Sequence, residues 1–155
     1  MSRMMMSWMI IAAFVMMVTA VPVYAGEAVT YEKDIKGIIA KRCIACHGSV
    51  SPTMEEFDRD KEGFKKKMKG PRYDTYANLM VVVKGSDAGA LMRRLDDGKN
   101  TKDGKPGNMH NYLGSTDAER SANLEIFRKW VGNWTLKRKK ELGKKELEAI
   151  RAPEK

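Results

Sequence analysis

The run Cys43-Ile44-Ala45-Cys46-His47 constrains this chain more than any other feature of its sequence. Two cysteines separated by two residues and followed at once by a histidine are typical of covalent attachment of a c-type haem. On a helix the two thiols lie about one turn apart, where they can add to the two vinyl groups along one edge of the porphyrin. The histidine then falls beneath the iron. We therefore expect Cys43 and Cys46 to hold the ring and His47 to be the proximal iron ligand.

Three other interpretations of the motif are weaker. A tetrahedral zinc site needs four ligands, and the two cysteines could be completed only by His47 and His110, at an unusual spacing. A thioredoxin-like dithiol expects a βαβ context that the sequence pattern lacks. A disulfide between Cys43 and Cys46 would close too small a loop to constrain much of the unfolded chain.

The N-terminal segment predicts export. Residues 4–21 are almost wholly apolar, Arg3 precedes them, and Val23 and Ala25 provide the small residues of a cleavage site. We expect a signal peptide over residues 1–25, cut after Ala25. The alternative is that residues 4–24 stay on as a membrane anchor, because they approach the roughly 20 residues that span a bilayer. Either way the remainder would be periplasmic or on the extracytoplasmic face of the membrane, where bacteria mature c-type haem.

The exported part has the size of one domain and is basic. Cleavage after Ala25 leaves 130 residues. The loss of Arg3 changes the formal charge from +9 to +8, with 28 basic residues against 20 acidic ones. In an exported chain this surplus indicates acidic protein partners or anionic lipid surfaces rather than nucleic acid. The lysines of residues 65–69 and the segment after Thr135 are candidates to steer such a partner.

The spacing of apolar residues is helical along the whole exported part and predicts an all-α fold. Helices are expected over residues 31–43, 75–83, 88–95 and 117–131, with a short surface helix within 55–68. Thr116 and Glu119 form the pattern of a capping box, and Gly132 is the expected end of the helix that follows. Residues 135–151 also show a helical pattern, but they carry few apolar side chains. We expect residues 135–155 to be a charged helical extension that lies on the surface or projects from the domain.

Residues 96–114 are too rich in Gly, Asn, Asp and Pro for a regular element. Their acidic residues do not have the spacing of a calcium loop. They do contain Met109, and a thioether held on a loop is the expected sixth ligand of an electron-transfer haem. The adjacent His110 leaves a second possibility open, in which the imidazole replaces the thioether on the iron.

Taken together, these motifs resemble the small monohaem cytochromes c that have CxxCH near the N-terminus and a methionine ligand near the C-terminus. The order of features is the same: a helix ending in CxxCH, a Lys-Pro-Gly-Asn-Met loop ending at Met109, and a helix with Trp130 near its end. The resemblance implies a cytochrome c-like domain over residues 26–134 around one covalently bound haem c. It also implies His47 proximal, Met109 distal, and contact between the first and last helices.

The sequence departs from the pattern of that family at two places. Ile39 stands four residues before Cys43, where many members carry an aromatic residue. Met109 is followed by His110 and Asn111, where many bacterial members have two prolines. The first departure affects helix packing, and the second is the reason that His110 stays open as a ligand.

An iron with both axial positions filled by protein has no open site for a substrate, so we expect one-electron transfer rather than catalysis. The expected setting is a respiratory or periplasmic redox chain, with redox proteins that have acidic docking surfaces as partners. Two alternatives stay open: a haem subunit of a membrane-bound redox complex, and a haem sensor or peroxidase-like protein with a labile sixth ligand.

Residues around the haem can also be anticipated. A metal-bound imidazole usually has its second nitrogen held by a hydrogen bond, and the carbonyl of Pro52 or Pro71 is expected to provide it. Aromatic residues that could line the pocket are Tyr73, Tyr76, Tyr112, Trp130 and Trp134.

Overall fold

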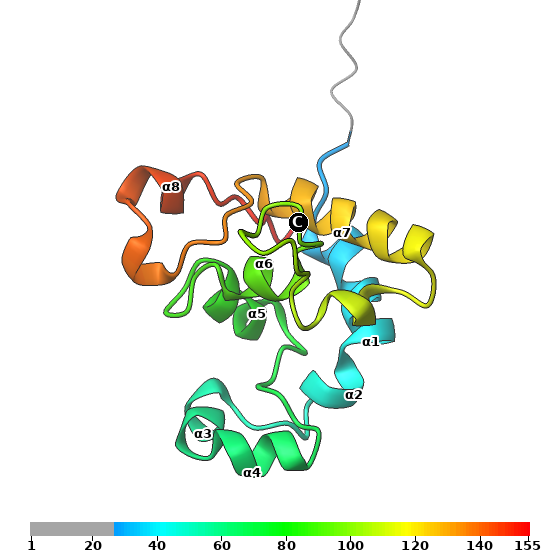
Figure 1. Cartoon of the computed structure of the whole chain (residues 1–155), viewed down its shortest axis with the longest axis vertical. Coiled ribbons are helices and arrows are strands. Elements are labelled where there is room, and N and C mark those ends of the chain that lie inside the picture. Colours follow the sequence, from blue (N-terminus) through cyan, green and yellow to red (C-terminus); the bar gives the residue numbers. More distant parts are fainter. Residues whose placement is uncertain (1–26) are drawn as a thin grey trace, which may run out of the picture.

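The computed structural model describes residues 27–155, and this part of the chain is built of helices without strands (Figure 1). The prediction of an all-α fold is confirmed. The expected signal peptide or anchor of residues 1–25 lies outside the described residues, among which no helix is long and apolar enough to cross a membrane. The helical elements are η1 (Tyr31–Ile35), α1 (Lys36–Arg42), α2 (Ile44–His47), α3 (Met54–Arg59), α4 (Lys61–Lys66), α5 (Tyr76–Val83), α6 (Ala90–Leu95), η2 (His110–Leu113), α7 (Asp117–Val131), η3 (Lys139–Glu141) and α8 (Lys144–Glu148).

The core forms where the N-terminal helical segment meets α7. The rings of Tyr31 in η1 and Trp130 in α7 lie 6.4 Å apart, and both side chains are buried. Ile35, Ile39 and Phe127 are buried in the same cluster. Burial of each such side chain stabilises the fold by about 1.5–3 kcal/mol. The expected contact between the first and last helices is therefore present, and Ile39 takes a core position without an aromatic ring.

Local capping decides where the helices begin. The Thr116 hydroxyl accepts a hydrogen bond from the Glu119 N–H at 3.1 Å, as expected for the start of α7. The Glu119 carboxylate, however, accepts from the N–H of Ser115 rather than of Thr116, so the predicted capping box is shifted by one residue. α7 ends at Gly132, where φ is +77°, a conformation that glycine adopts without steric cost.

Two short helices, α3 and α4, form a lobe that stands apart from the body in Figure 1. We call residues 52–72 the α3–α4 lobe. Two backbone hydrogen bonds close the base of the lobe. The Gly70 N–H donates to the Cys46 carbonyl of the CxxCH motif at 2.9 Å, and the Arg72 N–H donates to the Pro52 carbonyl at 2.8 Å. The lobe is therefore an excursion that begins and ends beside α2.

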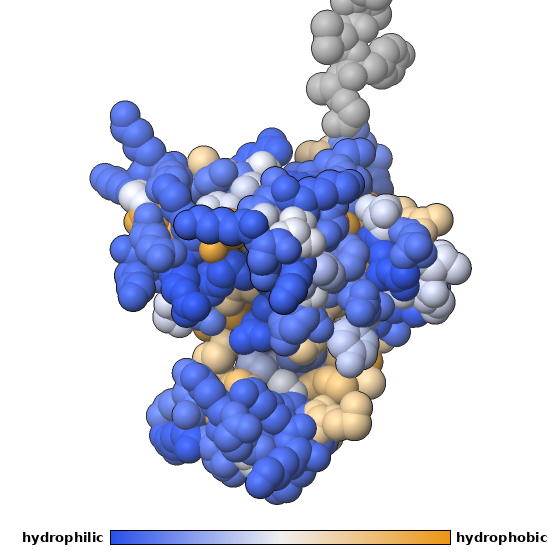
Figure 2. Space-filling view, in the orientation of Figure 1, coloured by the Kyte–Doolittle hydropathy of each residue, from blue (hydrophilic) through white to orange (hydrophobic). Residues whose placement is uncertain are grey.

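The surface of the lobe and most of the visible body is hydrophilic, as Figure 2 shows, while apolar residues come to the surface between the two. Among the large hydrophobic side chains, Ile44 in the CxxCH motif is 46% exposed and Met68 at the end of the lobe is 71% exposed. The apolar surface thus lies next to the candidate haem-attachment motif.

The C-terminal segment differs from the prediction. Instead of a continuous charged helix on the surface, residues 135–155 contain only η3 and the five-residue helix α8, and their end is built into the core. Ile150 is 2% exposed and Ala152 is fully buried. The N–H groups of Arg151 and Ala152 donate to the carbonyl oxygens of Val131 and Trp130. The expected single helix over residues 135–151 is therefore wrong, and so is the expectation that the end of the segment stays on the surface. The backbone contacts that bring this end into the core depend on no side-chain pattern.

Candidate functional site

The CxxCH motif lies at the junction of α1 and α2. The Cys43 N–H donates to the Ile39 carbonyl at 2.9 Å, and the His47 N–H donates to the Cys43 carbonyl at 2.9 Å. Cys43, Cys46 and His47 therefore share a single helical turn, as the sequence predicted. Both thiols are free, so the disulfide alternative does not describe this structure. Burial, with a smaller contribution from Cys46, raises the pKa of the Cys43 thiol to about 11.

The His47 ring is fixed by its surroundings. Its Nδ1 lies 2.6 Å from the carbonyl oxygen of Pro71, which can only accept, so Nδ1 carries the proton and Nε2 presents a lone pair. The predicted carbonyl therefore comes from Pro71, while that of Pro52 binds Arg72. Burial lowers the pKa of His47, against the raising effect of the Pro71 carbonyl, and Arg94 lowers it further. A neutral imidazole with a free Nε2 is the form that binds a metal.

The other sides of the His47 ring are closely packed. The ring of Tyr73 stacks on it with centroids 4.6 Å apart and planes 16° from parallel. On Gly70, a Cβ atom would lie 2.1 Å from the His47 Cε1, so no larger residue fits there without moving the ring. Pro71, Tyr73 and Gly70 all lie where the α3–α4 lobe rejoins the body, and the lobe thereby sets the orientation of the imidazole.

Met109 lies on the loop between α6 and η2, directly before η2. Its N–H donates to the Arg94 carbonyl at 2.9 Å, and the Gly107 N–H donates to the Asp96 carbonyl at 2.8 Å, so the loop is fastened to the end of α6. The half-buried Met109 side chain packs against the same hydrophobic core as Cys43. The structure therefore brings the loop and the CxxCH turn to one core, from two distant parts of the sequence.

His110 points to a different partner. Its Nδ1 lies 3.0 Å from the carbonyl oxygen of Leu95, which fixes the ring against the end of α6. In the part of the chain that the structure describes, no three His, Cys, Asp or Glu side chains gather as a metal site. The zinc alternative, which needed His110 beside His47 and the two cysteines, is not supported by the structure.

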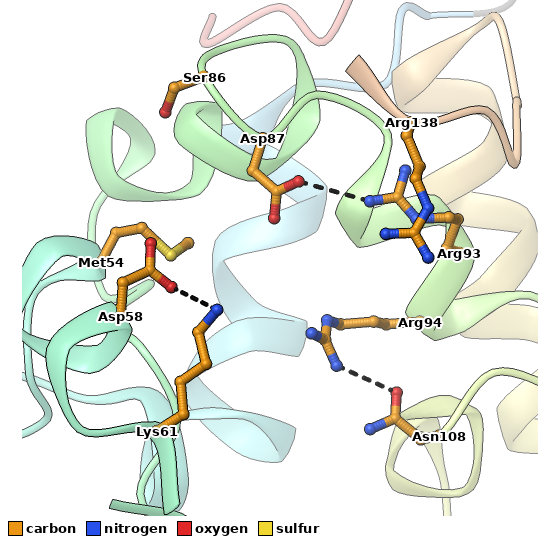
Figure 3. A pocket seen from close by; sticks show the side chains of 9 residues that line it. All are labelled: Met54, Asp58, Lys61, Ser86, Asp87, Arg93, Arg94, Asn108 and Arg138. Carbon is orange, nitrogen blue, oxygen red and sulfur yellow. Dashed lines mark hydrogen bonds and ion pairs between the residues drawn. The ribbon is translucent and has the colours of Figure 1, made fainter. Parts of the chain in front are cut away.

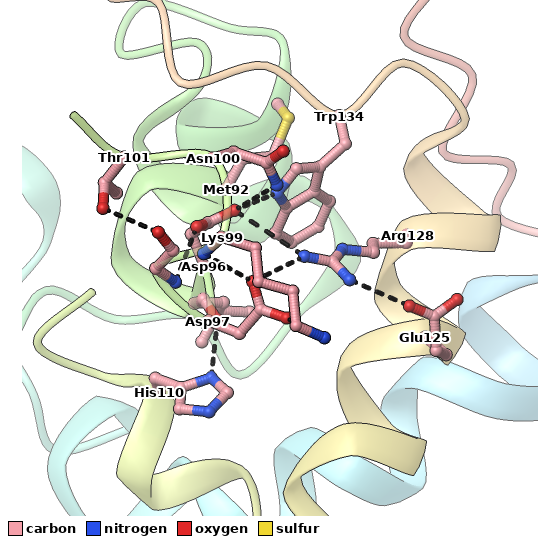
Figure 4. A network of polar contacts seen from close by, with 12 residues as sticks. Met92, Asp96, Asp97, Lys99, Asn100, Thr101, His110, Glu125, Arg128 and Trp134 are labelled. Carbon is pink, nitrogen blue, oxygen red and sulfur yellow. Dashed lines mark hydrogen bonds and ion pairs between the residues drawn. The ribbon is translucent and has the colours of Figure 1, made fainter. Parts of the chain in front are cut away.

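A buried polar network holds the loop that carries Met109 (Figure 4). Asp96 is fully buried, and its carboxylate accepts hydrogen bonds from the Gly98 N–H at 2.9 Å and the Trp134 indole N–H at 2.8 Å. Arg128 of α7 binds Asp97 at 3.0 Å and lies 3.8 Å from Asp96. Sequence reasoning missed this network. A signal was present in Asp96-Asp97-Gly98 directly after an apolar helical run, but it does not identify the partners.

The five candidate aromatic residues have different environments. Tyr73 is the only one of them that stacks on His47 among the described contacts. Trp130 is a core residue, and Tyr76 donates its hydroxyl hydrogen to the Ala152 carbonyl at 3.0 Å. Trp134 belongs to the Asp96 network, whereas Tyr112 is 59% exposed.

Comparison with known proteins decides the family. The model of the PccH cytochrome c family matches residues 30–153, which is most of the chain. This chain belongs to the PccH cytochrome c family. The match runs through residues 135–153 as well as the helices around CxxCH, in agreement with the burial of Ile150 and Ala152.

One solved structure of this family is similar along most of its length. The monohaem cytochrome PccH from Geobacter sulfurreducens shares 48% sequence identity, with 81% of this chain and 98% of that chain covered and a TM-score of 0.76. No curated protein matches the chain. These findings confirm the resemblance to small monohaem cytochromes c and the expected cofactor, one covalently bound haem c.

The chain's own residues fit that cofactor. The CxxCH turn offers two free thiols, and the imidazole beside them has Nδ1 engaged and Nε2 available. The thioether of Met109 is a soft ligand suited to haem iron. It lies on a loop that is held by backbone hydrogen bonds to the Arg94 and Asp96 carbonyls. Family membership, as a cytochrome c, indicates a role in electron transfer.

Proposed function

We propose that this protein is an exported one-electron carrier whose haem is bound through thioethers to Cys43 and Cys46. His47 Nε2 is the proximal iron ligand and the Met109 thioether is the distal one. The observation that carries the proposal is the 2.6 Å contact between His47 Nδ1 and the Pro71 carbonyl, which fixes the tautomer that metal ligation needs. The iron of the bound haem supplies the one-electron couple.

The protein's contribution is to hold the ligands still and to exclude water. Tyr73 restricts the His47 ring on one face and Gly70 at the Cε1 edge, and the Pro71 carbonyl increases the basicity of the imidazole. Fastening of the Met109 loop to α6 limits motion of the sixth ligand. Small movement on oxidation favours fast electron transfer, and occupation of both axial positions disfavours bond chemistry at the iron.

We assign the sixth position to Met109 rather than His110 because of their different contacts. The Met109 side chain packs against the core that Cys43 also contacts, whereas the His110 ring is held at the Leu95 carbonyl. A thioether ligand raises the reduction potential relative to a second imidazole.

Spectroscopy of the holoprotein tests the assignment. In Met109→Ala the weak far-red absorption band of thioether ligation should disappear and the reduction potential should fall, while His110→Ala should keep both. Mass spectrometry of the protein matured with haem should show one covalent haem, and none in Cys43→Ala/Cys46→Ala. Loss of the band in His110→Ala but not in Met109→Ala would show that the ligand assignment is wrong. Ready carbon monoxide binding by the reduced wild-type protein would favour the sensor or peroxidase-like alternative instead.

The expected partner is a redox protein with an acidic surface, on the periplasmic or extracytoplasmic side of the membrane. The apolar surface includes Ile44 and Met68, and Met68 stands among the four lysines of residues 65–69. Of these, Lys69 donates to the Ala45 carbonyl of the CxxCH motif at 3.4 Å. The rate of electron exchange with such a partner should fall as ionic strength rises, because the Debye length decreases to about 8 Å at physiological salt. If the rate of electron exchange does not change with salt, the lysines do not steer the partner.

A further inference from the structure

A hollow of about 660 Å³ lies between the α3–α4 lobe and α6 (Figure 3). One wall comes from the lobe, with Asp58 and Lys61, and the opposite wall comes from α6, with Arg93 and Arg94. Figure 3 shows the Arg94 side chain extending from α6 into the space between the walls. The remaining lining residues are Met54, Ser86, Asp87, Asn108 and Arg138.

The charges around this hollow are unequal. Four cationic side chains line it against two carboxylates. The two carboxylates already have partners in the wall: Asp58 is 3.0 Å from Lys61, and Asp87 is 3.4 Å from Arg93. Two cationic groups are therefore left over.

The remaining cations are the guanidinium groups of Arg94 and Arg138. Arg94 donates only to the neutral amide oxygen of Asn108, at 3.3 Å. The nearby Glu141 carboxylate is engaged by the backbone N–H of Arg138, at 2.7 Å. Within the described residues, neither guanidinium forms an ion pair with a carboxylate. Two unpaired arginines facing one hollow are an arrangement that fits a doubly negative ligand.

The two walls of the hollow are connected to the two proposed axial ligands. Asn108 directly precedes Met109, and the Arg94 carbonyl accepts the Met109 N–H. On the other side, the wall with Asp58 and Lys61 belongs to the α3–α4 lobe, whose Pro71 carbonyl lies 2.6 Å from the His47 Nδ1. A molecule held between the two ligands would thus have this hollow beside it.

We propose that Arg94 and Arg138 bind the two propionate carboxylates of the haem in this hollow. The inference rests on the proposed function and adds the residues that neutralise the cofactor's charge. A carboxylate removed from water needs a charged hydrogen-bond partner, and an arginine fork provides a bidentate one. The two charges left unpaired in the wall equal the two charges that the propionates bring.

The test is the reduction potential of holoprotein variants. Arg94→Gln and Arg138→Gln should each lower the equilibrium constant for reduction about tenfold, equivalent to about 59 mV for one electron, because removal of a cation stabilises the ferric state. The potential of each variant should also depend on pH, since a propionate without its arginine takes up a proton more readily. Arg94→Lys, which keeps the charge, should restore most of the lost potential.

Arg59→Gln provides the matched control, because Arg59 is an exposed arginine of the lobe that pairs with Glu55 on the same helix. The inference is overturned if Arg94→Gln and Arg138→Gln change the potential no more than Arg59→Gln does. The far-red band keeps the two proposals separate. A band retained in variants with an unchanged potential refutes only the propionate assignment, whereas a wild-type protein without that band refutes the Met109 ligation itself.

Discussion

The indole N–H of Trp130 donates a hydrogen bond to the carbonyl oxygen of Pro153 at 2.8 Å. Trp130 lies in the centre of the core, so this bond joins the last residues of the chain to the packing around η1 and α7. The Tyr31 N–H binds the same carbonyl at 2.9 Å. Tyr31 and Trp130 thereby share one acceptor in the last described segment.

This connection predicts that the C-terminal residues stabilise the whole domain. Ile150→Ala should lower the free energy of unfolding by about 2–5 kcal/mol, because it removes a fully packed side chain at 2% exposure. Lys144→Ala, at a side chain that is 90% exposed on α8, is the matched control and should have little effect. Denaturant unfolding of both holoproteins gives the comparison. Equal stability of the two variants would mean that residues 150–153 are not part of the core.

The Asp96 network predicts a link between α7 and the iron. Asp96→Asn removes a fully buried charge and places an NH₂ group among donors, so the unfolding free energy should fall by about 1–3 kcal/mol. Because the Met109 loop is fastened beside Asp96, the far-red band should also disappear at a lower temperature than in the wild type. Asp103→Asn, at an exposed position of the same loop, should leave both properties unchanged. If the band of Asp96→Asn survives heating as in the wild type, the network does not act on the ligand.

Glu119 gives a pH dependence whose direction follows from its contacts. The Ser115 N–H and then the Arg42 guanidinium lower the pKa of Glu119 from 4.5 to about 2. A lowered pKa in the folded state stabilises the protein above the unfolded value, and this stabilisation is lost as pH falls from about 4.5 towards 2. Glu119→Gln should therefore be less stable than the wild type at neutral pH. The difference in stability between Glu119→Gln and the wild type should vanish as pH approaches about 2. Thermal unfolding of both proteins across this pH range measures it. A constant difference at all pH values would contradict the assignment.

Gly70 predicts a steric effect on the proximal ligand. In Gly70→Ala the new Cβ would lie 2.1 Å from the His47 Cε1, so the ring must turn and its bond to the Pro71 carbonyl must weaken. Loss of such a supporting contact weakens ligation on the order of 10-fold. The pH at which acid has displaced His47 from half of the iron should rise accordingly. Gly37→Ala on α1, where no atom lies within 4 Å of the added carbon, is the control. An unchanged midpoint in Gly70→Ala would show that the ring has room to move.

The strongest patterns in the sequence predicted the fold well. The CxxCH turn and the helix ending at Gly132 follow from local spacing and capping, and both are found where expected. The choice between Pro52 and Pro71 could not be made from the sequence, because it depends on how the α3–α4 lobe returns to the body. Acidic residues are usually exposed, so burial of Asp96 against Trp134 and Arg128 was not expected either. Such contacts join distant parts of the chain and leave no periodic signal.

The α3–α4 lobe leaves and rejoins the body at neighbouring points, where backbone hydrogen bonds join Gly70 to Cys46 and Arg72 to Pro52. An excursion closed at its base can vary in length or composition between these anchors without displacing the Pro71 carbonyl. Grafting a different sequence over residues 62–68, which excludes Asp58 and Lys61 of the hollow, is thus a route to redirect molecular recognition while the chemistry of the redox centre is inherited intact.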